Sequence, residues 1–157
     1  IFARTSKALT RISKMFADKT IEKVYWAVVK NRPPKESDTL LHYLVRNRVK
    51  NKSFAYDKQV NDSKLAELDY KVIMTSDKYF LLEIVLKTGR HHQIRTQLSK
   101  IGMPIKGDLK YGFPRSNENA GIHLHARRVK FIHPVTKELI QVIAPLPEDS
   151  LWKAFES

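Results

Sequence analysis

The sequence contains no cysteine and no long apolar run, and each absence excludes whole classes of protein. Without cysteine the chain has no disulfide, no thiol nucleophile, and no zinc or iron–sulfur site with cysteine ligands. The apolar runs are far shorter than the roughly 20 residues that a membrane-spanning helix needs, and the N-terminus lacks a signal-peptide pattern. We therefore expect no membrane partner and a location in the reducing cytoplasm.

Acidic residues are also scarce, so positive charge dominates. The 157 residues include 29 Lys and Arg against 16 Asp and Glu, which gives a formal net charge of +13. Such an excess is typical of proteins that bind a polyanion, and phosphate backbones are the leading candidates. Because 42% of the residues are hydrophobic, the chain has enough apolar surface for one core.

Hydrophobic periodicity predicts an α+β fold: a mixed, mostly antiparallel sheet of about seven strands with about three packed helices. The expected helices are residues 6–17, a short helix around Ile94, Leu98 and Ile101, and a last helix after Asp149. The expected strands are residues 21–30, 40–45, 53–56, 65–75, 79–87, 123–132 and 138–144. Because no linker interrupts this pattern, we expect residues 1–157 to form a single domain.

The most informative segment lies where a strand is expected to run directly into a helix, at residues 86–95, LKTGRHHQIR. Gly89 gives the turn a free backbone, and the helix N-terminus beside Arg90 favours an anion such as phosphate. His91 and Arg95 lie one helical turn apart and share a face. Because a guanidinium at the edge of a core needs an anionic partner, Arg95 is either a site residue or half of a structural ion pair.

Two basic segments are candidate nucleic-acid contacts. In RNRVKNK the cations alternate, and they would point to one side of an extended segment; they are Arg46, Arg48, Lys50 and Lys52. The second segment is the glycine-bracketed loop at residues 107–112, preceded by Lys106 and containing Lys110. Interleaved imidazole and phenol rings can stack on bases while the cations bind phosphates. The plain alternatives are an edge strand protected by charge and a solvated basic face.

Tyr25 lies in the strand segment KVYWA, where a tyrosine is more often a packing residue than a catalytic one. The six histidines form no recognisable metal-binding pattern, so no metal site is expected. The sequence also lacks the motifs of P-loop, dinucleotide-binding and serine-esterase sites, so no cofactor is indicated.

Residues 86–112, LKTGRHHQIRTQLSKIGMPIKGDLKYG, closely resemble the signature of the RluA-type RNA pseudouridine synthases, T-G-R-x-H-Q-I-R followed by P-I-x-G-D-x-x-Y-G. Other segments follow the family's order: FARTSKAL at 2–9, KVYWAVV at 23–29, AELDY at 66–70 and LHARRVKFIHP at 124–134. The resemblance covers essentially the whole chain. It implies an enzyme that isomerises uridine to pseudouridine in structured RNA, ribosomal RNA or tRNA, without metal or cofactor. A noncatalytic RNA-binding module with the same fold is the alternative.

The resemblance also implies roles for individual residues. Tyr25 would stack on the flipped-out uracil and take part in proton removal at C5, and Arg95 would pair with an essential aspartate. The family carries that aspartate in H-R-L-D-x-x-T-S-G, which places it upstream of Ile1, whereas Asp108 is expected to be a structural or loop-fixing residue. The chain is thus expected to be the C-terminal portion of the catalytic domain and inactive alone. The expected RNA contacts are Arg46, Arg48, Lys50, Lys52, Arg90, His91, His92, Lys106 and Lys110.

Overall fold

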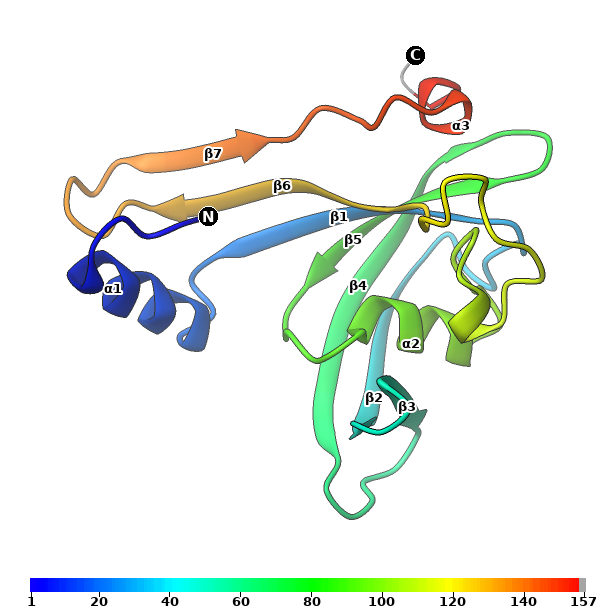
Figure 1. The fold of residues 1–157 in the computed structure, drawn as a ribbon, viewed down its shortest axis with the longest axis horizontal. Coiled ribbons are helices and arrows are strands. Elements are labelled where there is room, and N and C mark those ends of the chain that lie inside the picture. Colours follow the sequence, from blue (N-terminus) through cyan, green and yellow to red (C-terminus); the bar gives the residue numbers. More distant parts are fainter. Residues whose placement is uncertain (156–157) are drawn as a thin grey trace.

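A seven-stranded antiparallel sheet forms the frame of the computed structural model, which describes residues 1–155 (Figure 1). Its strands are β1 (Glu22–Val29), β2 (Ser37–Asn47), β3 (Lys52–Tyr56), β4 (Lys64–Thr75), β5 (Phe80–Leu86), β6 (Leu124–Ile132) and β7 (Leu139–Ile143). The helices are α1 (Ser6–Ala17), α2 (Gln93–Lys100), α3 (Ser150–Lys153) and the 3₁₀ helix η1 (Leu109–Tyr111). The strand order is β3-β2-β4-β5-β1-β6-β7. The expected α+β fold, with seven strands and three helices, is confirmed.

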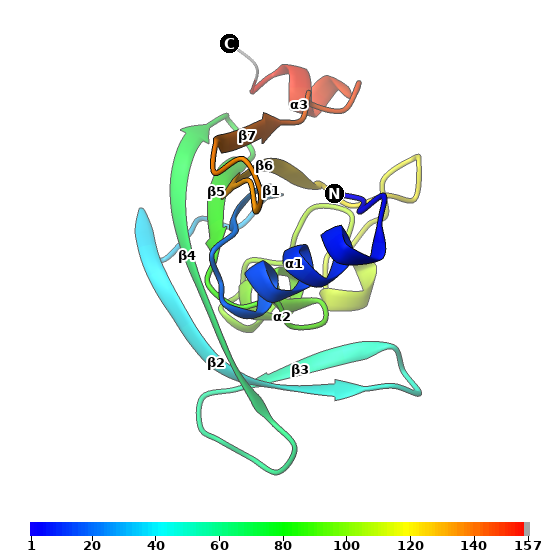
Figure 2. The same ribbon diagram turned by 90° about the vertical axis from the view of Figure 1, so that its left-hand side faces the viewer.

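The alternation of residues along β1 shows how the sheet separates two cores. Ala27 is fully buried in a cluster that includes Leu98 of α2. Its neighbour Val28 points to the other face and packs with Trp152 and Phe155 at the C-terminal end. In Figure 2 the curved sheet wraps around the side on which α1 and α2 lie, while α3 lies beyond the opposite face. The face with α2 is the one that carries the candidate site.

β2 is longer than its hydrophobic pattern indicates. Residues 40–45 carry the expected strand signal, but β2 extends from Ser37 to Asn47. It is hydrogen-bonded to β4 on one side and to β3 on the other. Because partners on both sides satisfy the backbone, the strand continues through polar residues that alone give no strand signal.

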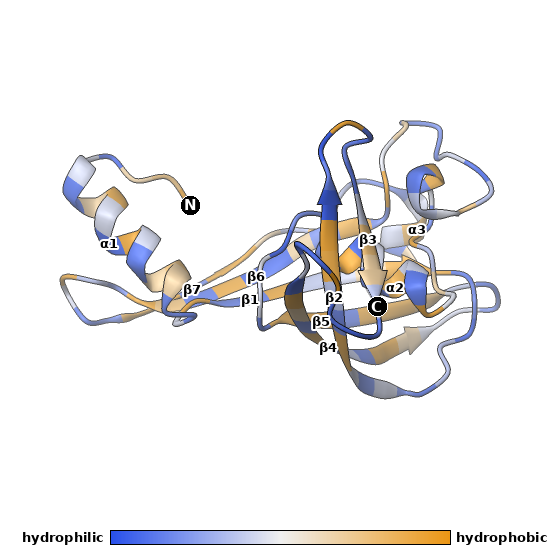
Figure 3. Ribbon diagram, turned by 90° about the horizontal axis from the view of Figure 1, so that it is seen from below, coloured by the Kyte–Doolittle hydropathy of each residue, from blue (hydrophilic) through white to orange (hydrophobic). Residues whose placement is uncertain are grey.

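α1 forms where the sequence predicts it, but none of its residues is buried. The Thr5 hydroxyl caps the helix by accepting a hydrogen bond from the backbone N–H of Ala8 at 3.2 Å. Leu9 and Phe16 of the apolar stripe remain 58% and 44% exposed. Figure 3 shows α1 standing apart from the body of the sheet, near the far end of β6 and β7. Among residues 1–155, no helix is long and apolar enough to cross a bilayer.

Candidate active site

The connection between β5 and α2 sets the direction of α2. The side chain of Gln93 is buried, and its oxygen accepts hydrogen bonds from the Thr88 hydroxyl at 2.8 Å and from the Arg90 backbone at 2.9 Å. Its amide nitrogen donates to the carbonyl of Glu67 on β4 at 3.0 Å. These three bonds fasten the turn to the sheet and place the first turn of α2 above it.

His92, the residue before α2, has a left-handed backbone with φ 53°. This conformation is uncommon for residues other than glycine, although histidine adopts it more readily than most. The His92 ring lies beside Tyr111, with Nδ1 at 3.0 Å from the tyrosine hydroxyl. The turn thus directs an imidazole inward at the start of the helix.

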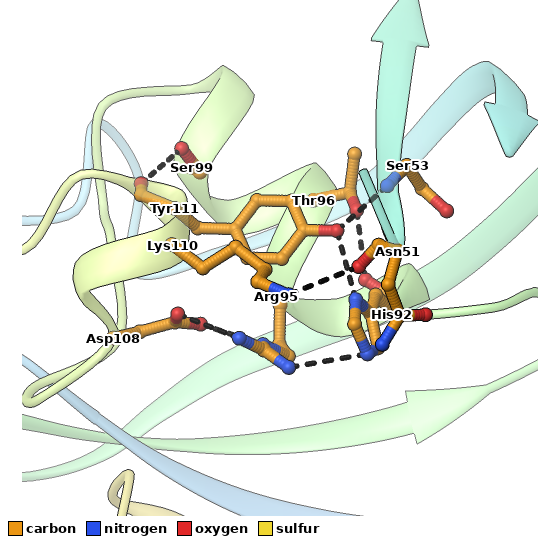
Figure 4. Close-up of polar contacts among 9 residues, drawn as sticks. All are labelled: Asn51, Ser53, His92, Arg95, Thr96, Ser99, Asp108, Lys110 and Tyr111. Carbon is orange, nitrogen blue, oxygen red and sulfur yellow. Dashed lines mark hydrogen bonds and ion pairs between the residues drawn. The ribbon is translucent and has the colours of Figure 1, made fainter. Parts of the chain in front are cut away.

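Arg95 is held by three different groups (Figure 4). Its Nε and Nη2 donate to the two carboxylate oxygens of Asp108 at 2.7 and 2.8 Å. Its Nη1 lies 3.2 Å from Nε2 of His92, and its guanidinium carbon lies 4.8 Å from the centre of the Tyr111 ring. A bidentate pair of this kind fixes the guanidinium in position and in plane.

The structure gives Arg95 a partner within the chain, Asp108, which is not the upstream aspartate that the resemblance implies. Asp108 is 1% exposed, and both of its oxygens are bonded to the arginine. The two residues are brought together because the chain between them turns at Gly102 and Gly107, both with positive φ. A guanidinium has five N–H groups, so these contacts leave one N–H on each terminal nitrogen of Arg95. A further anion can therefore still bind it.

Tyr111 connects β3 to α2, a role that its sequence pattern does not predict. Its hydroxyl accepts a hydrogen bond from the backbone N–H of Ser53 on β3 at 2.8 Å. Its carbonyl accepts from the Ser99 hydroxyl of α2 at 2.6 Å, and Lys52 lies 5.1 Å from its ring centre. The available sequence signal was a tyrosine inside the glycine-bracketed loop GDLKYG, but nothing in that pattern shows that the ring turns towards β3.

His91 and His92 present uncharged rings at neutral pH. Their centroids are 3.8 Å apart in a stacked arrangement. Burial, followed by the positive charges of Arg95, His91 and Lys110, lowers the pKa of His92 to about 4. Burial and the neighbouring cations also lower the pKa of His91 from its ordinary value. Neutral stacked imidazoles beside cations suit contact with a base better than contact with a second phosphate.

Tyr25 lies on the same face of the sheet as α2. Within residues 1–155, no hydrogen bond joins Tyr25 to Arg95. Tyr25 packs against the core cluster that contains Ile94, and burial raises the pKa of its hydroxyl. Lys23, two residues before it on β1, shares its face and lines a hollow. That hollow lies between the end of α1, the start of β1 and the β5–α2 turn. Tyr25 itself does not line that hollow, and its half-buried ring packs against the core.

The four hairpin cations do not form the straight row that an extended segment would give. Arg46 lies on β2 and Lys52 on β3, whereas Arg48 and Lys50 lie in the turn between them. The side chain of Asn47 closes this turn by accepting from the Lys50 backbone at 2.8 Å. The cations instead surround the tip of a hairpin.

The remaining predicted contacts divide between two places. Arg90 and His91 line a second hollow together with Arg46 and Arg48, and Lys110 donates to the carbonyl of Asn51 in the hairpin turn at 3.2 Å. Lys106 is separate from them. It donates to the side chain of Asn117 at 2.5 Å and lines another hollow, near α3. Within residues 1–155, no group of three or more His, Asp or Glu residues is arranged to hold a metal ion.

Comparison with known proteins connects this geometry to a family. The family model described as RNA pseudouridylate synthase matches residues 1–100. An uncharacterized RNA pseudouridine synthase of Chlorobaculum parvum is 33% identical over 95% of this chain and 51% of its own length. One from Bacillus subtilis is 33% identical over 94% of this chain and 48% of its own length, so this chain spans about half of these relatives.

A solved structure shares the fold. The human protein named RNA pseudouridylate synthase domain containing 1 matches 92% of this chain and 62% of its own, with a TM-score of 0.76 and 24% identity. The family match covers β1, β5 and the T-G-R-H-H-Q-I-R segment, which are the elements that position Tyr25 and Arg95. This chain belongs to the RNA pseudouridylate synthase family.

Proposed function

We propose that the protein containing this chain isomerises uridine to pseudouridine in structured RNA of the cytoplasm, either ribosomal RNA or tRNA. The reaction breaks the bond from ribose C1′ to uracil N1 and forms a bond from C1′ to C5; the C5 proton is then removed, and N1 gains a proton. The observation that carries the proposal is the fixed guanidinium of Arg95, which keeps an N–H on each terminal nitrogen for another anion. In an enzyme of this family that anion is the essential carboxylate.

Each predicted site residue has a physical role in this reaction. The target base must leave its stack to be reached, and the ring of Tyr25 offers a surface on which uracil can stack. The hydroxyl of Tyr25 is the group we assign to proton removal at C5. Arg95 keeps the essential carboxylate ionised, because a nearby positive charge lowers the pKa of an acid, and orients it by charge-assisted hydrogen bonds.

The essential carboxylate is proposed to lie outside this chain. Asp108, the acid beside Arg95, is 1% exposed and uses both oxygens on the arginine, so neither is open to a nucleotide. The relatives are about twice as long as the chain, and the apolar stripe of α1 is left uncovered. We infer that residues 1–157 are the C-terminal portion of the catalytic domain and are inactive alone.

RNA binding is proposed for the cations around the β2–β3 hairpin and the β5–α2 turn. Seven predicted contacts gather there, six cations and the neutral His91, and Lys106 is a further cation on a separate surface. The seven are Arg46, Arg48, Lys50, Lys52, Arg90, His91 and Lys110. His92 is proposed as a further contact; its two ring nitrogens face Tyr111 and Arg95, as those of His91 face Ser53 and Asn51.

A noncatalytic RNA-binding module is the second candidate. The observation that favours it is that Asp108 already balances the charge of Arg95 within the chain. An ion pair of this kind would be retained for structure even if no reaction took place. This candidate predicts RNA binding that survives without any turnover.

One experiment separates the two candidates. The complete gene product is expressed and incubated with unmodified ribosomal RNA and with unmodified tRNA, and pseudouridine is measured by mass spectrometry of the digested RNA. We expect pseudouridine at a defined position in one of them. Binding to both RNAs without any product would instead support the noncatalytic module. Residues 1–157 expressed alone are expected to form no product.

A further inference from the structure

The contacts around the His92 ring determine which nitrogen carries its proton. A guanidinium can only donate hydrogen bonds, so the Nε2 atom that lies 3.2 Å from Nη1 of Arg95 must offer a lone pair. A neutral imidazole then carries its hydrogen on Nδ1. That nitrogen lies 3.0 Å from the hydroxyl of Tyr111 and donates to it.

The hydroxyl of Tyr111 therefore accepts two hydrogen bonds. One comes from Nδ1 of His92, and the other comes from the backbone N–H of Ser53 at 2.8 Å. Ser53 is 2% exposed and lies on β3, directly after the basic turn of the hairpin. The chain of contacts thus runs from the hairpin through Tyr111 and His92 to Arg95 (Figure 4).

We propose that Tyr111 is a positioning residue for Arg95 and that it acts through His92. The inference rests on the proposed function, in which Arg95 binds the essential carboxylate. Asp108 holds the side of the guanidinium formed by Nε and Nη2, so Nη1 depends on His92 for its acceptor. The tyrosine hydroxyl keeps the His92 lone pair aimed at Nη1.

Loss of that hydroxyl has a defined consequence. The Nδ1 hydrogen of His92 loses its acceptor, so only the contact with Arg95 still favours the Nδ1–H tautomer, and the other tautomer becomes more populated. In the other tautomer Nε2–H faces a guanidinium that can only donate, and the contact becomes repulsive. Arg95 would keep its ion pair with Asp108, but its Nη1 atom would lose the acceptor that orients it. The effect should thus fall on the rate of the bound complex more than on RNA affinity.

A substitution that removes only the hydroxyl tests this role in the full-length enzyme. Tyr111→Phe keeps the ring beside Arg95, and we expect kcat to fall between about 10-fold and 100-fold while KM changes by less than about threefold. The matched control is Tyr56→Phe, which removes a hydroxyl from the same hairpin at a residue that is 41% exposed. It should leave both constants within about twofold of the wild type. A fall in affinity alone for Tyr111→Phe would overturn the proposal.

A double-mutant cycle tests whether the hydroxyl acts through His92. If it does, Tyr111→Phe combined with His92→Ala should be no slower than His92→Ala alone, because the second change removes what the first one orients. Losses that multiply would mean that Tyr111 acts through the hairpin or the ring face, and the proposal would be wrong.

A measurement independent of activity keeps this inference separate from the proposed function. Nitrogen NMR of the ¹⁵N-histidine-labelled full-length protein at pH 7 reports which ring nitrogen of His92 carries hydrogen. We expect the Nδ1–H form in the wild type and a mixture of both forms in Tyr111→Phe. An Nε2–H form in the wild type would contradict the inference even if the enzyme forms pseudouridine. Absence of pseudouridine with the expected tautomers would contradict only the proposed function.

Discussion

At the scale of single residues, Arg95 connects three parts of the site. It is part of α2, it forms an ion pair with Asp108 in the following loop, and it lies against the Tyr111 ring. We expect Arg95→Ala in the full-length enzyme to abolish most turnover and to weaken RNA binding only modestly. Single-turnover kinetics and equilibrium binding on the same RNA measure the two effects. Equal losses in both would indicate that Arg95 contacts a phosphate.

The ion pair between Asp108 and Arg95 should also matter for stability. Removing one partner of a buried pair costs about 3 kcal/mol or more, because the remaining charge loses its partner. Asp108→Ala should therefore lower the free energy of unfolding by about this amount. Asp69→Ala is the matched control, since its pair with Lys87 at 3.0 Å is 39% and 47% exposed and is worth less than about 1 kcal/mol. Urea unfolding of both variants decides the point.

The sequence predicted part of this site and missed another part for a definable reason. The motif singled out Arg95, but helical spacing predicted His91 on its face, whereas α2 begins at Gln93 and the histidine beside Arg95 is His92. The partnership with Asp108 depends on two glycine turns between residues 95 and 108, whose combined direction no local pattern specifies. Tyr111 was missed for the same reason, because its importance comes from β3, which lies far from it in sequence.

At the scale of elements, the β2–β3 hairpin presents a dense cluster of cations. Arg48 and Lys50 lie exposed in its turn. Each cation that neutralises a phosphate adds about 0.7 to the slope of log affinity against log salt on single-stranded RNA. The double variant Arg48→Gln and Lys50→Gln should lower the affinity and reduce this slope by about 1.4, with little change in the rate at saturation.

The control for the hairpin removes the same charge elsewhere. Lys71 and Lys78 are exposed near the β4–β5 turn, and Figure 1 shows that turn at the opposite end of β4 from the hairpin. Changing both to Gln should leave the slope unchanged if RNA binds at the hairpin. An equal decrease from the two pairs would mean that the net charge of the protein, and not the hairpin, determines binding.

Local patterns located the elements well and their packing less well. Alternating β-branched and aromatic residues placed all seven strands, because a half-buried strand has apolar residues at every second position. The strands on either side of the basic segment were predicted, but the turn between them was not, because RNRVKNK alternates as a strand does although Asn51 adopts a positive φ there. The apolar stripe of α1 predicted packing against the sheet, whereas Leu9 and Phe16 remain exposed. A stripe shows that a helix can pack, but not which part of a protein covers it.

At the scale of the whole molecule, buried histidines should make stability depend on pH. Burial is the largest cause that lowers the pKa of each of four histidines below the ordinary 6.5: His42, His91, His92 and His123. As the pH falls below 6.5, the unfolded chain binds protons at these rings before the folded chain does. The free energy of unfolding therefore decreases with falling pH through this range.

His92 should contribute measurably to this decrease. Its pKa is about 4 in the folded state and the ordinary value is 6.5, so between these two pH values the ring is protonated mainly in the unfolded chain. His92→Asn keeps a residue that tolerates the left-handed backbone and cannot take up a proton in this range. We expect the difference in unfolding free energy between pH 7 and pH 4.5 to be smaller in the variant than in the wild type. Urea unfolding at several pH values measures it, and carboxylates titrate equally in both proteins. An unchanged difference would mean that His92 is protonated in the folded protein, which the guanidinium of Arg95 beside it should prevent.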